Sequence, residues 1–255
     1  MVSLANARTP PDMRIYAIGD VHGCRDALRE VHGWIRDDLN RRPTPDWRII
    51  HLGDFIDRGP DSPGVLDDVI EWSADAHVLS VCGNHDSYLT TFLADPLDNA
   101  YERWASYGGH QTIAAYGVDT AMNPEADQAQ RQALHSALSA RVPPTHVAFI
   151  SGLPFSLQFG DYLFVHAGIR PGVPLAEQTA RDFMWTREPF LSCPDPFDFI
   201  VVHGHTPVHD IEVRHNRIGI DTGCVFGRQL SCLVLDGAEK AQLVGSRLEP
   251  LPELA

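Results

Sequence analysis

The segment 53–59, with the sequence GDFIDRG, constrains the fold of this chain more than any other stretch. It follows an apolar run at 47–52, and a short apolar run that stops at Gly-Asp is typical of a buried strand. In an open α/β sheet, ligands bind at the carboxyl ends of the strands. We therefore expect Asp54 at such an end, with Asp57 and Arg58 close behind it. A carboxylate beside an arginine suits a metal ion next to a phosphate.

The same design occurs twice more in the first hundred residues. A strand expected at 14–18 ends in GDVHG, and a strand expected at 76–82 ends in GNHD. Residues two apart in an extended chain face the same way, so Asp20 and His22 can reach one metal ion. Helices are predicted over 24–40, over 61–73 and from about Asp86 to Ala94. Strands that alternate with helices indicate an α/β class with a parallel sheet.

The second half of the chain changes to strand-like patterns. A hairpin is predicted at 155–165, a strand at 199–202, a second hairpin around 215–216 and closing strands at 230–235 and 242–244. We expect an antiparallel half that packs as a second sheet on the first, with helices outside. Residues 1–12 are predicted to be a loose leader, and residues 13–255 a single domain. The helix-like segment 95–150 is predicted to be a cap over the site.

Composition excludes several classes of protein. The 255 residues include 20 Lys plus Arg and 34 Asp plus Glu, so the formal charge is −14. Nucleic acid is therefore an unlikely partner, because gripping its phosphates needs a basic face. No apolar run is long enough to span a bilayer, and the N-terminus lacks a secretory signal.

The five cysteines form no C-x-x-C pair, which favours a reduced, cytoplasmic protein. Whether Cys24 is redox-active or only packed stays open, as does the oligomeric state.

Five expected strand ends carry side chains that could hold metal ions. A single Asp or His at a strand end is usually a cap or turn residue, but five such ends on one sheet edge are hard to explain structurally. Oxygen and imidazole ligands without cysteine suit two divalent ions, of which Mn²⁺ is our first choice and Fe, Zn or Ni the alternatives. The residues concerned are Asp20, His22, Asp54, Asn84, His85, His166 and His205.

These motifs together resemble the phosphoprotein phosphatase family of calcineurin-like metallophosphoesterases. The matching patterns are G-D-x-H-G at 19–23, G-D-x-x-D-R-G at 53–59, G-N-H-[DE] at 83–86, H-[AG]-G at 166–168 and G-H at 204–205. The resemblance spans residues 15 to 230 and is closest to the bacterial serine/threonine protein phosphatases and the symmetrical diadenosine tetraphosphatases. It implies a four-layer αββα sandwich of two mixed sheets flanked by helices.

The resemblance also implies a role for each motif residue. Asp20, His22 and Asp54 would hold the first metal ion, and Asp54 would bridge to a second held by Asn84, His166 and His205. Ions about 4 Å apart would clamp a phosphate and share a nucleophilic hydroxide.

The family resemblance further implies which side chains act on the phosphate ester. His85, oriented by Asp57, would be the general acid that protonates the leaving oxygen. Arg58, Asn84 and Arg187 would bind the substrate phosphate, although Arg187 could instead form a surface salt bridge with Glu188 or Asp182. His203 precedes the motif glycine and is predicted to be structural or to support the site indirectly.

The chemistry is better determined by the sequence than the substrate is. Asp57 favours a serine/threonine protein phosphatase, because the symmetrical diadenosine tetraphosphatases that the chain also resembles commonly lack this aspartate. Hydrolysis of diadenosine tetraphosphate is the alternative, and a 2′,3′-phosphatase of RNA ends is a third. A non-catalytic phosphate-binding module is the alternative of another class. The expected partner is a phosphorylated protein or a small phosphate ester.

Overall fold

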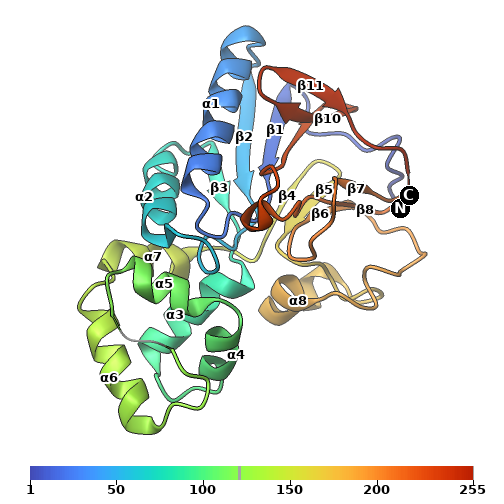
Figure 1. Ribbon diagram of the computed structural model, residues 1–255. Coiled ribbons are helices and arrows are strands. Elements are labelled where there is room, and N and C mark those ends of the chain that lie inside the picture. The colour runs from blue at the N-terminus through green and yellow to red at the C-terminus, as the bar shows by residue number, and fades with distance from the viewer. Residues whose placement is uncertain (120–121, 255) are drawn as a thin grey trace.

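The computed structural model describes residues 1–119 and 122–254 of the chain. Within these ranges the strands form two mixed sheets, and α-helices pack around them (Figure 1). The strands are β1 (Met13–Ile18), β2 (Asp46–His51), β3 (Val78–Ser80), β4 (Ser156–Phe159), β5 (Tyr162–Val165), β6 (Ile200–His203), β7 (Glu212–Val213), β8 (Arg217–Gly219), β9 (Cys232–Asp236), β10 (Glu239–Val244) and β11 (Arg247–Pro250). The helices are α1 (Arg25–Arg41), α2 (Ser62–Trp72), α3 (Asn84–Ala94), α4 (Ala100–Ser106), α5 (Gly109–Ala115), α6 (Gln128–Ser139), α7 (Pro144–Gly152) and α8 (Ala180–Trp185).

The six-stranded sheet joins both ends of the chain. Its order is β11-β10-β9-β1-β2-β3, with β1, β2 and β3 parallel and β9 antiparallel to β1. The C-terminal strands therefore belong to the first sheet, and our assignment of them to a separate antiparallel half is wrong. The second sheet has the order β4-β5-β6-β8-β7, and β5, β6 and β8 within it run parallel. Two mixed sheets result, as the family resemblance implied.

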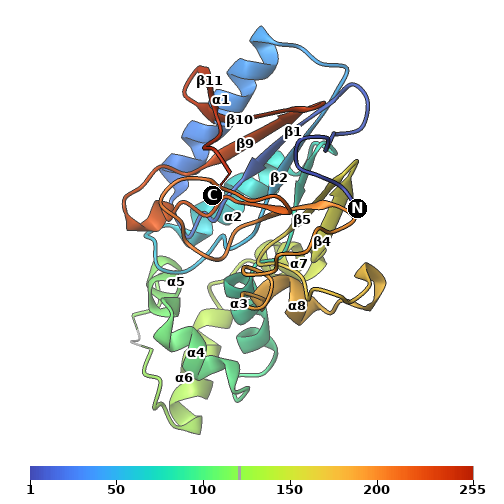
Figure 2. The same cartoon turned by 90° about the vertical axis from the view of Figure 1, so that its right-hand side faces the viewer.

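Strand β1 shows how the layers are built, because successive side chains of a strand face opposite ways. Ile15 and Ala17 lie in the apolar core between the sheets. Tyr16 and Ile18 face the other way, into the core under the helices. Figures 1 and 2 show α1 and α2 beside the six-stranded sheet and α8 on the far side of the five-stranded sheet. A third core, around Phe183 of α8, covers that outer face.

Helices α4, α5 and α6 of the segment 95–150 gather at one end of the molecule (Figures 1 and 2). Helix α4 buries Trp104, which packs on Phe92 of α3 with ring centroids 5.4 Å apart. Helices α4 and α5 are separated at Gly108, which has a φ of +106° that only glycine adopts readily. Whether the segment caps the site stays a prediction.

The first twelve residues are packed, although the sequence predicted a loose leader. Leu4 and Ala7 are buried in the core between the sheets. The N–H of Val2 donates to the Phe197 carbonyl, and the N–H of Thr9 donates to the Gly237 carbonyl. The leader is held because its apolar side chains cover the open edge of this core. No helix in the described part of the chain combines the length and the apolar character that crossing a membrane requires.

Helix α3 begins at Asn84, two residues earlier than predicted. The Asp86 carboxylate accepts a hydrogen bond from the N–H of Gly83, the residue that caps the helix. A carboxylate in the first turn satisfies a free backbone donor and favours the helix dipole. Asp86 therefore extends the helix toward the end of β3 and places Asn84 and His85 in its first turn.

Candidate active site

The predicted metal ligands come together where the two sheets meet. Asp20, His22, Asp54 and Asn84 follow strands of the six-stranded sheet, whereas His166 and His205 follow β5 and β6 of the other. None of the six exposes more than 7% of its surface. Two groups have ligand atoms within 4.8 Å of one another: His22 with Asp54 and His85, and Asp54 with His166 and His205. Asp54 is common to both groups, which is the position that the sequence predicted for a bridging ligand.

The backbone is strained at these residues. Positive φ angles occur at His22 (45°), Asp54 (52°), Asp57 (74°), Arg58 (66°) and His205 (64°). Each such non-glycine conformation costs on the order of 1–3 kcal/mol and persists only where the surrounding structure enforces it. Strain that coincides with the predicted site residues supports a functional role for them.

Two glycines allow the loops of the site to approach closely. A Cβ atom at Gly204 would collide with the Oδ1 of Asp20, and one at Gly83 would collide with the backbone N and Oδ1 of Asp54. The glycines of the Gly-Asn and Gly-His pairs are therefore required, because any side chain there would push these loops apart.

Backbone carbonyls orient two of the imidazole rings. The Nδ1 of His22 donates to the Ile56 carbonyl, and the Nδ1 of His166 donates to the Leu52 carbonyl, both at 2.8 Å. Each ring then directs its Nε2 toward the Oδ2 of Asp54, at 3.4 Å and 3.3 Å. Holding a ligand ring through its other nitrogen is the usual arrangement around protein-bound metal ions.

Electrostatics favour a cation at this place. Burial lowers the pKa of His22 to about 3 and that of His205 to about 2, so both rings are neutral. Burial acts in the same direction on His166, but the nearby carboxylates of Asp54 and Asp20 outweigh it and raise its pKa to about 10. The carboxylates therefore stabilise positive charge that lies between the sheets.

Two buried ligand atoms have no hydrogen-bond partner among the described residues: the Oδ1 of Asp20 and the Nε2 of His205. Buried polar atoms are normally paired, because an unpaired one costs on the order of 1–3 kcal/mol. The other carboxylate oxygen of Asp20 accepts the N–H of His205 at 2.9 Å. Unpaired imidazole and carboxylate atoms suit a divalent ion, so the residues present fit the predicted metal pair.

His85, Asp57 and Arg58 form a connected group beside this cluster. The Nδ1 of His85 donates to the Oδ2 of Asp57 at 2.7 Å. The Arg58 guanidinium donates to the Nε2 of His85 at 2.8 Å and to the Nε2 of His22 at 2.6 Å. It therefore lies against the group of His22, Asp54 and His85, where a phosphate could accept its two parallel N–H bonds.

The remaining predicted residues fall into two sets. Asn84 lies in the cluster, with its Oδ1 2.9 Å from the Nε2 of His166. Arg187 is exposed and follows α8; its Nη2 donates to the carbonyl of His205 at 3.3 Å. Asp182, one of its alternative partners, lies near Arg170 instead. His203 turns away, with its ring against Phe190 at a centroid distance of 5.2 Å, in agreement with a structural role.

Sequence reasoning assigned no role to two further carboxylates. Asp86 accepts three backbone N–H bonds, from Gly83, Asp54 and Phe55, and so ties the loops after β2 and β3 together. Asp221 is buried and close enough to Asp20 to raise the pKa of that carboxyl, after burial itself. Asp221 comes shortly after β8 as Asp20 comes after β1, so the same strand-end pattern could have identified it.

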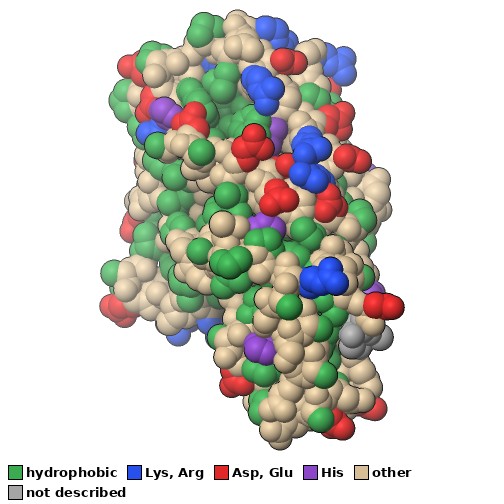
Figure 3. All heavy atoms as spheres, turned by 90° about the vertical axis from the view of Figure 1, so that its left-hand side faces the viewer, with side chains coloured by type: hydrophobic (Ala, Val, Ile, Leu, Met, Phe, Trp, Pro, Cys, Tyr) green, Lys and Arg blue, Asp and Glu red, His purple; other side chains and the backbone are tan. Residues whose placement is uncertain are grey.

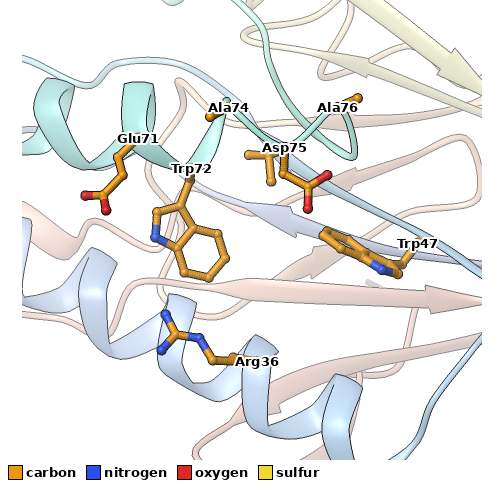
Figure 4. Close-up of a pocket in the computed structure, with 8 residues that line it drawn as sticks. Arg36, Trp47, Glu71, Trp72, Ala74, Asp75 and Ala76 are labelled. Atoms are coloured by element: carbon orange, nitrogen blue, oxygen red, sulfur yellow. The ribbon is translucent and has the colours of Figure 1, made fainter.

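A cavity of about 730 Å³ lies elsewhere (Figure 4). Trp47 and Val78, which line it, are at the starts of β2 and β3, whereas Asp54 and Asn84 follow the ends of these strands. Figure 4 shows Arg36 of α1 and Trp72 of α2 pointing toward one another, with the guanidinium carbon 5.4 Å from the ring centroid. This cavity is thus at the opposite end of the strands from the metal ligands.

Comparisons with known proteins agree with this geometry. The model of the family described as calcineurin-like phosphoesterase matches residues 13–232. A relative named asymmetrical bis(5′-nucleosyl)-tetraphosphatase PrpE, from Anoxybacillus flavithermus, is 28% identical and covers 85% of this chain and 88% of its own. A symmetrical bis(5′-nucleosyl)-tetraphosphatase from Janthinobacterium is also 28% identical and covers 88% of this chain and 93% of its own. The crystal structure of a cold-active protein-tyrosine phosphatase from Shewanella has the same fold, with a TM-score of 0.58 at 15% identity over 98% of this chain and 84% of its own.

Proposed function

Because the chain belongs to the calcineurin-like phosphoesterase family, we propose that it hydrolyses bis(5′-nucleosyl) tetraphosphates at a two-metal centre. Membership makes it a metallophosphoesterase, a hydrolase of phosphoric ester bonds. The observation that carries the proposal is the position of Asp54 in both groups of ligand atoms, His22–Asp54–His85 and Asp54–His166–His205. The substrate class rests on the names of relatives that align along most of the chain.

The proposed metal ligands are those that the family resemblance implied: Asp20, His22, Asp54, Asn84, His166 and His205. We propose Mn²⁺ as the ion, with Fe, Zn or Ni as alternatives. When bound, a pair of such ions polarises the phosphoryl group and lowers the pKa of water, which makes a nucleophile available at neutral pH.

The side chains near the metal ligands have separate tasks in this proposal. Arg58 binds two phosphoryl oxygens with its guanidinium. His85 donates a proton from Nε2 to the leaving oxygen once the phosphate has taken over the Arg58 guanidinium, which bonds Nε2 in the free protein; its Nδ1 stays committed to Asp57 at 2.7 Å. Arg187, which contacts the loop that carries His205, binds a further phosphate oxygen.

A phosphoprotein phosphatase is the second candidate, as the sequence first suggested. The observation that favours it is the hydrogen-bonded pair of His85 and Asp57. A serine or threonine alkoxide is a poorer leaving group than a nucleotide, so its departure depends more on a general acid. Charge counts against an RNA substrate: acidic side chains lie interspersed with basic ones on the face shown in Figure 3.

One assay separates these candidates. Mn²⁺-loaded protein is given diadenosine tetraphosphate, a phosphoserine/phosphothreonine peptide and an RNA with a 2′,3′-cyclic end, and His85→Asn serves as the control. We expect the dinucleotide to be cleaved fastest, and the products would show whether attack is symmetrical (two ADP) or asymmetrical (ATP and AMP). Faster peptide turnover would overturn the dinucleotide proposal in favour of a protein phosphatase. Binding of phosphate without turnover of any ester would indicate a non-catalytic module.

A further inference from the structure

The Asp57 carboxylate is held from two sides. On one side it accepts the Nδ1–H of His85. On the other, the indole N–H of Trp104 lies 3.0 Å from each of its oxygens, and the hydroxyl of Thr112 donates to its Oδ1 at 2.7 Å. Asp57, Trp104 and Thr112 have no exposed surface. Both outer donors come from the helical segment 95–150, at distances of 47 and 55 residues along the chain.

The turn between α4 and α5 is shaped for this contact. A Cβ atom at Gly109 would come within 2.6 Å of the indole nitrogen of Trp104. The carbonyl of Gly108 accepts the backbone N–H of Arg58 at 3.1 Å, and the backbone N–H of Asp57 donates to the Thr112 hydroxyl at 2.9 Å. The turn therefore fixes the backbone of the loop 53–59 as well as the carboxylate at its centre.

We propose that Trp104 and Thr112 are positioning residues for proton donation by His85. This inference deepens the proposed function and rests on the phosphoesterase chemistry assigned there, although on no particular substrate. A buried carboxylate with a single donor could rotate about its side-chain torsions and point away from His85. The indole and hydroxyl donors leave one orientation in which both oxygens are paired, and in it the Oδ2 faces the Nδ1 of His85. Through Trp104 and Thr112, the helices of the segment 95–150 thus contribute to the chemistry of the site.

A purely structural role is the competing explanation, because Trp104 also belongs to the helical core. The test uses the full-length, Mn²⁺-loaded protein with Trp104→Phe and Thr112→Val, which remove the donors and keep most of the shape. Matched controls are Trp34→Phe on α1 and Thr90→Val on α3, where the hydroxyl bonds only the helix carbonyl of Ser87.

The measurement is kcat and KM for two monoesters, p-nitrophenyl phosphate and an alkyl phosphate. The first has a good leaving group and needs little acid catalysis, whereas the second depends on it. We expect kcat for the alkyl ester to fall about tenfold more than kcat for the aryl ester in each variant, with KM nearly unchanged, because a hydrogen bond to a charged group is lost. Equal losses for the two esters, or the same effect in the controls, would overturn the proposal.

A second measurement does not require turnover. The hydrogen-bonded Nδ1–H of His85 should give a downfield proton resonance in the NMR spectrum of the Zn²⁺-loaded protein, since paramagnetic Mn²⁺ would broaden it. The resonance is assigned by its loss in His85→Asn. We expect it to move or disappear in Trp104→Phe and Thr112→Val and to stay in the controls. An unchanged resonance would overturn the positioning role even if the protein cleaves phosphate esters. A changed resonance in a protein that cleaves none would support the role while the proposed function fails.

Discussion

At the scale of single residues, three histidines of the site are oriented by a hydrogen bond from one ring nitrogen to another group of the protein. His22 and His166 give their Nδ1 to a backbone carbonyl, and His85 gives its Nδ1 to a carboxylate. A carbonyl accepts the Nδ1 proton and leaves Nε2 directed at the site, which suits a metal ligand. A carboxylate stabilises the protonated ring, which suits a general acid. The partner of Nδ1 thus separates the predicted ligands from the predicted acid.

His85→Asn tests this distinction, because His85 also lies within reach of His22 and Asp54. We expect the variant to keep its full metal content by elemental analysis and to lose about 10²–10⁴-fold in kcat. The backbone N–H of residue 85, which donates to Asp54, is unaffected by the change. A variant that loses metal together with activity would make His85 a ligand and remove it from the role of acid.

At the scale of elements, the face between α1 and β2 contains a polar pair with no part in the site. His32 of α1 and His51 of β2 are buried with their Nε2 atoms 2.9 Å apart, and His32 stacks on Trp72 of α2. Burial lowers the pKa of His32 to about 2 and that of His51 to about 4. Both rings are therefore neutral in the folded protein at neutral and mildly acidic pH.

This pair makes the stability of the fold depend on pH. Below the unfolded pKa of about 6.5, the unfolded chain binds protons that the folded chain excludes, so the free energy of unfolding decreases as pH falls. The loss is about 1.4 kcal/mol per pH unit for each histidine and ends near the folded pKa values. His32→Gln keeps a polar partner for His51 and should reduce the slope measured by urea unfolding between pH 6.5 and 5. The same slope in the variant and in the wild type would contradict the neutral buried pair.

At the scale of the whole molecule, the site joins the two sheets. Asp20, His22 and Asp54 come from one sheet, and His166 and His205 come from the other, where the core between the sheets ends. A metal ion shared by these residues would connect the layers in addition to their apolar packing and to the hydrogen bonds that His166 and His205 make with Leu52 and Asp20. The ligands then contribute to stability as well as to chemistry.

Metal binding should therefore raise the melting temperature. At a free Mn²⁺ concentration one hundred times the Kd, we expect a gain of about 2.7 kcal/mol in the free energy of unfolding, and a chelator should reverse it. Asp54→Asn should abolish both the thermal shift and the bound metal, because Asp54 belongs to both ligand groups. A wild-type melting temperature that Mn²⁺ does not change would contradict a metal centre between the sheets.

The sequence by itself determined the chemistry of the strand ends. Gly-Asp, Gly-Asn and Gly-His pairs after short apolar runs identified Asp20, Asp54, Asn84 and His205, because strand periodicity and tight turns are encoded by neighbouring residues. The same local signals predicted the mixed α/β class. Local patterns carry no information on which distant segments meet. The parallel sheet and the strand-end residues were therefore predictable from local patterns, whereas the grouping of these residues around Asp54 came from the family resemblance.

Only the tertiary structure decided three features. Strand β9 pairs with β1 across more than 200 residues, Leu4 and Ala7 of the N-terminal segment pack into the core, and Trp104 and Thr112 hold Asp57. Each depends on apolar surfaces that become adjacent only when the two sheets and the helices pack together. The segment 95–150 looks like a peripheral helical insertion in the sequence, because nothing in its own pattern points to a carboxylate some fifty residues earlier in the chain.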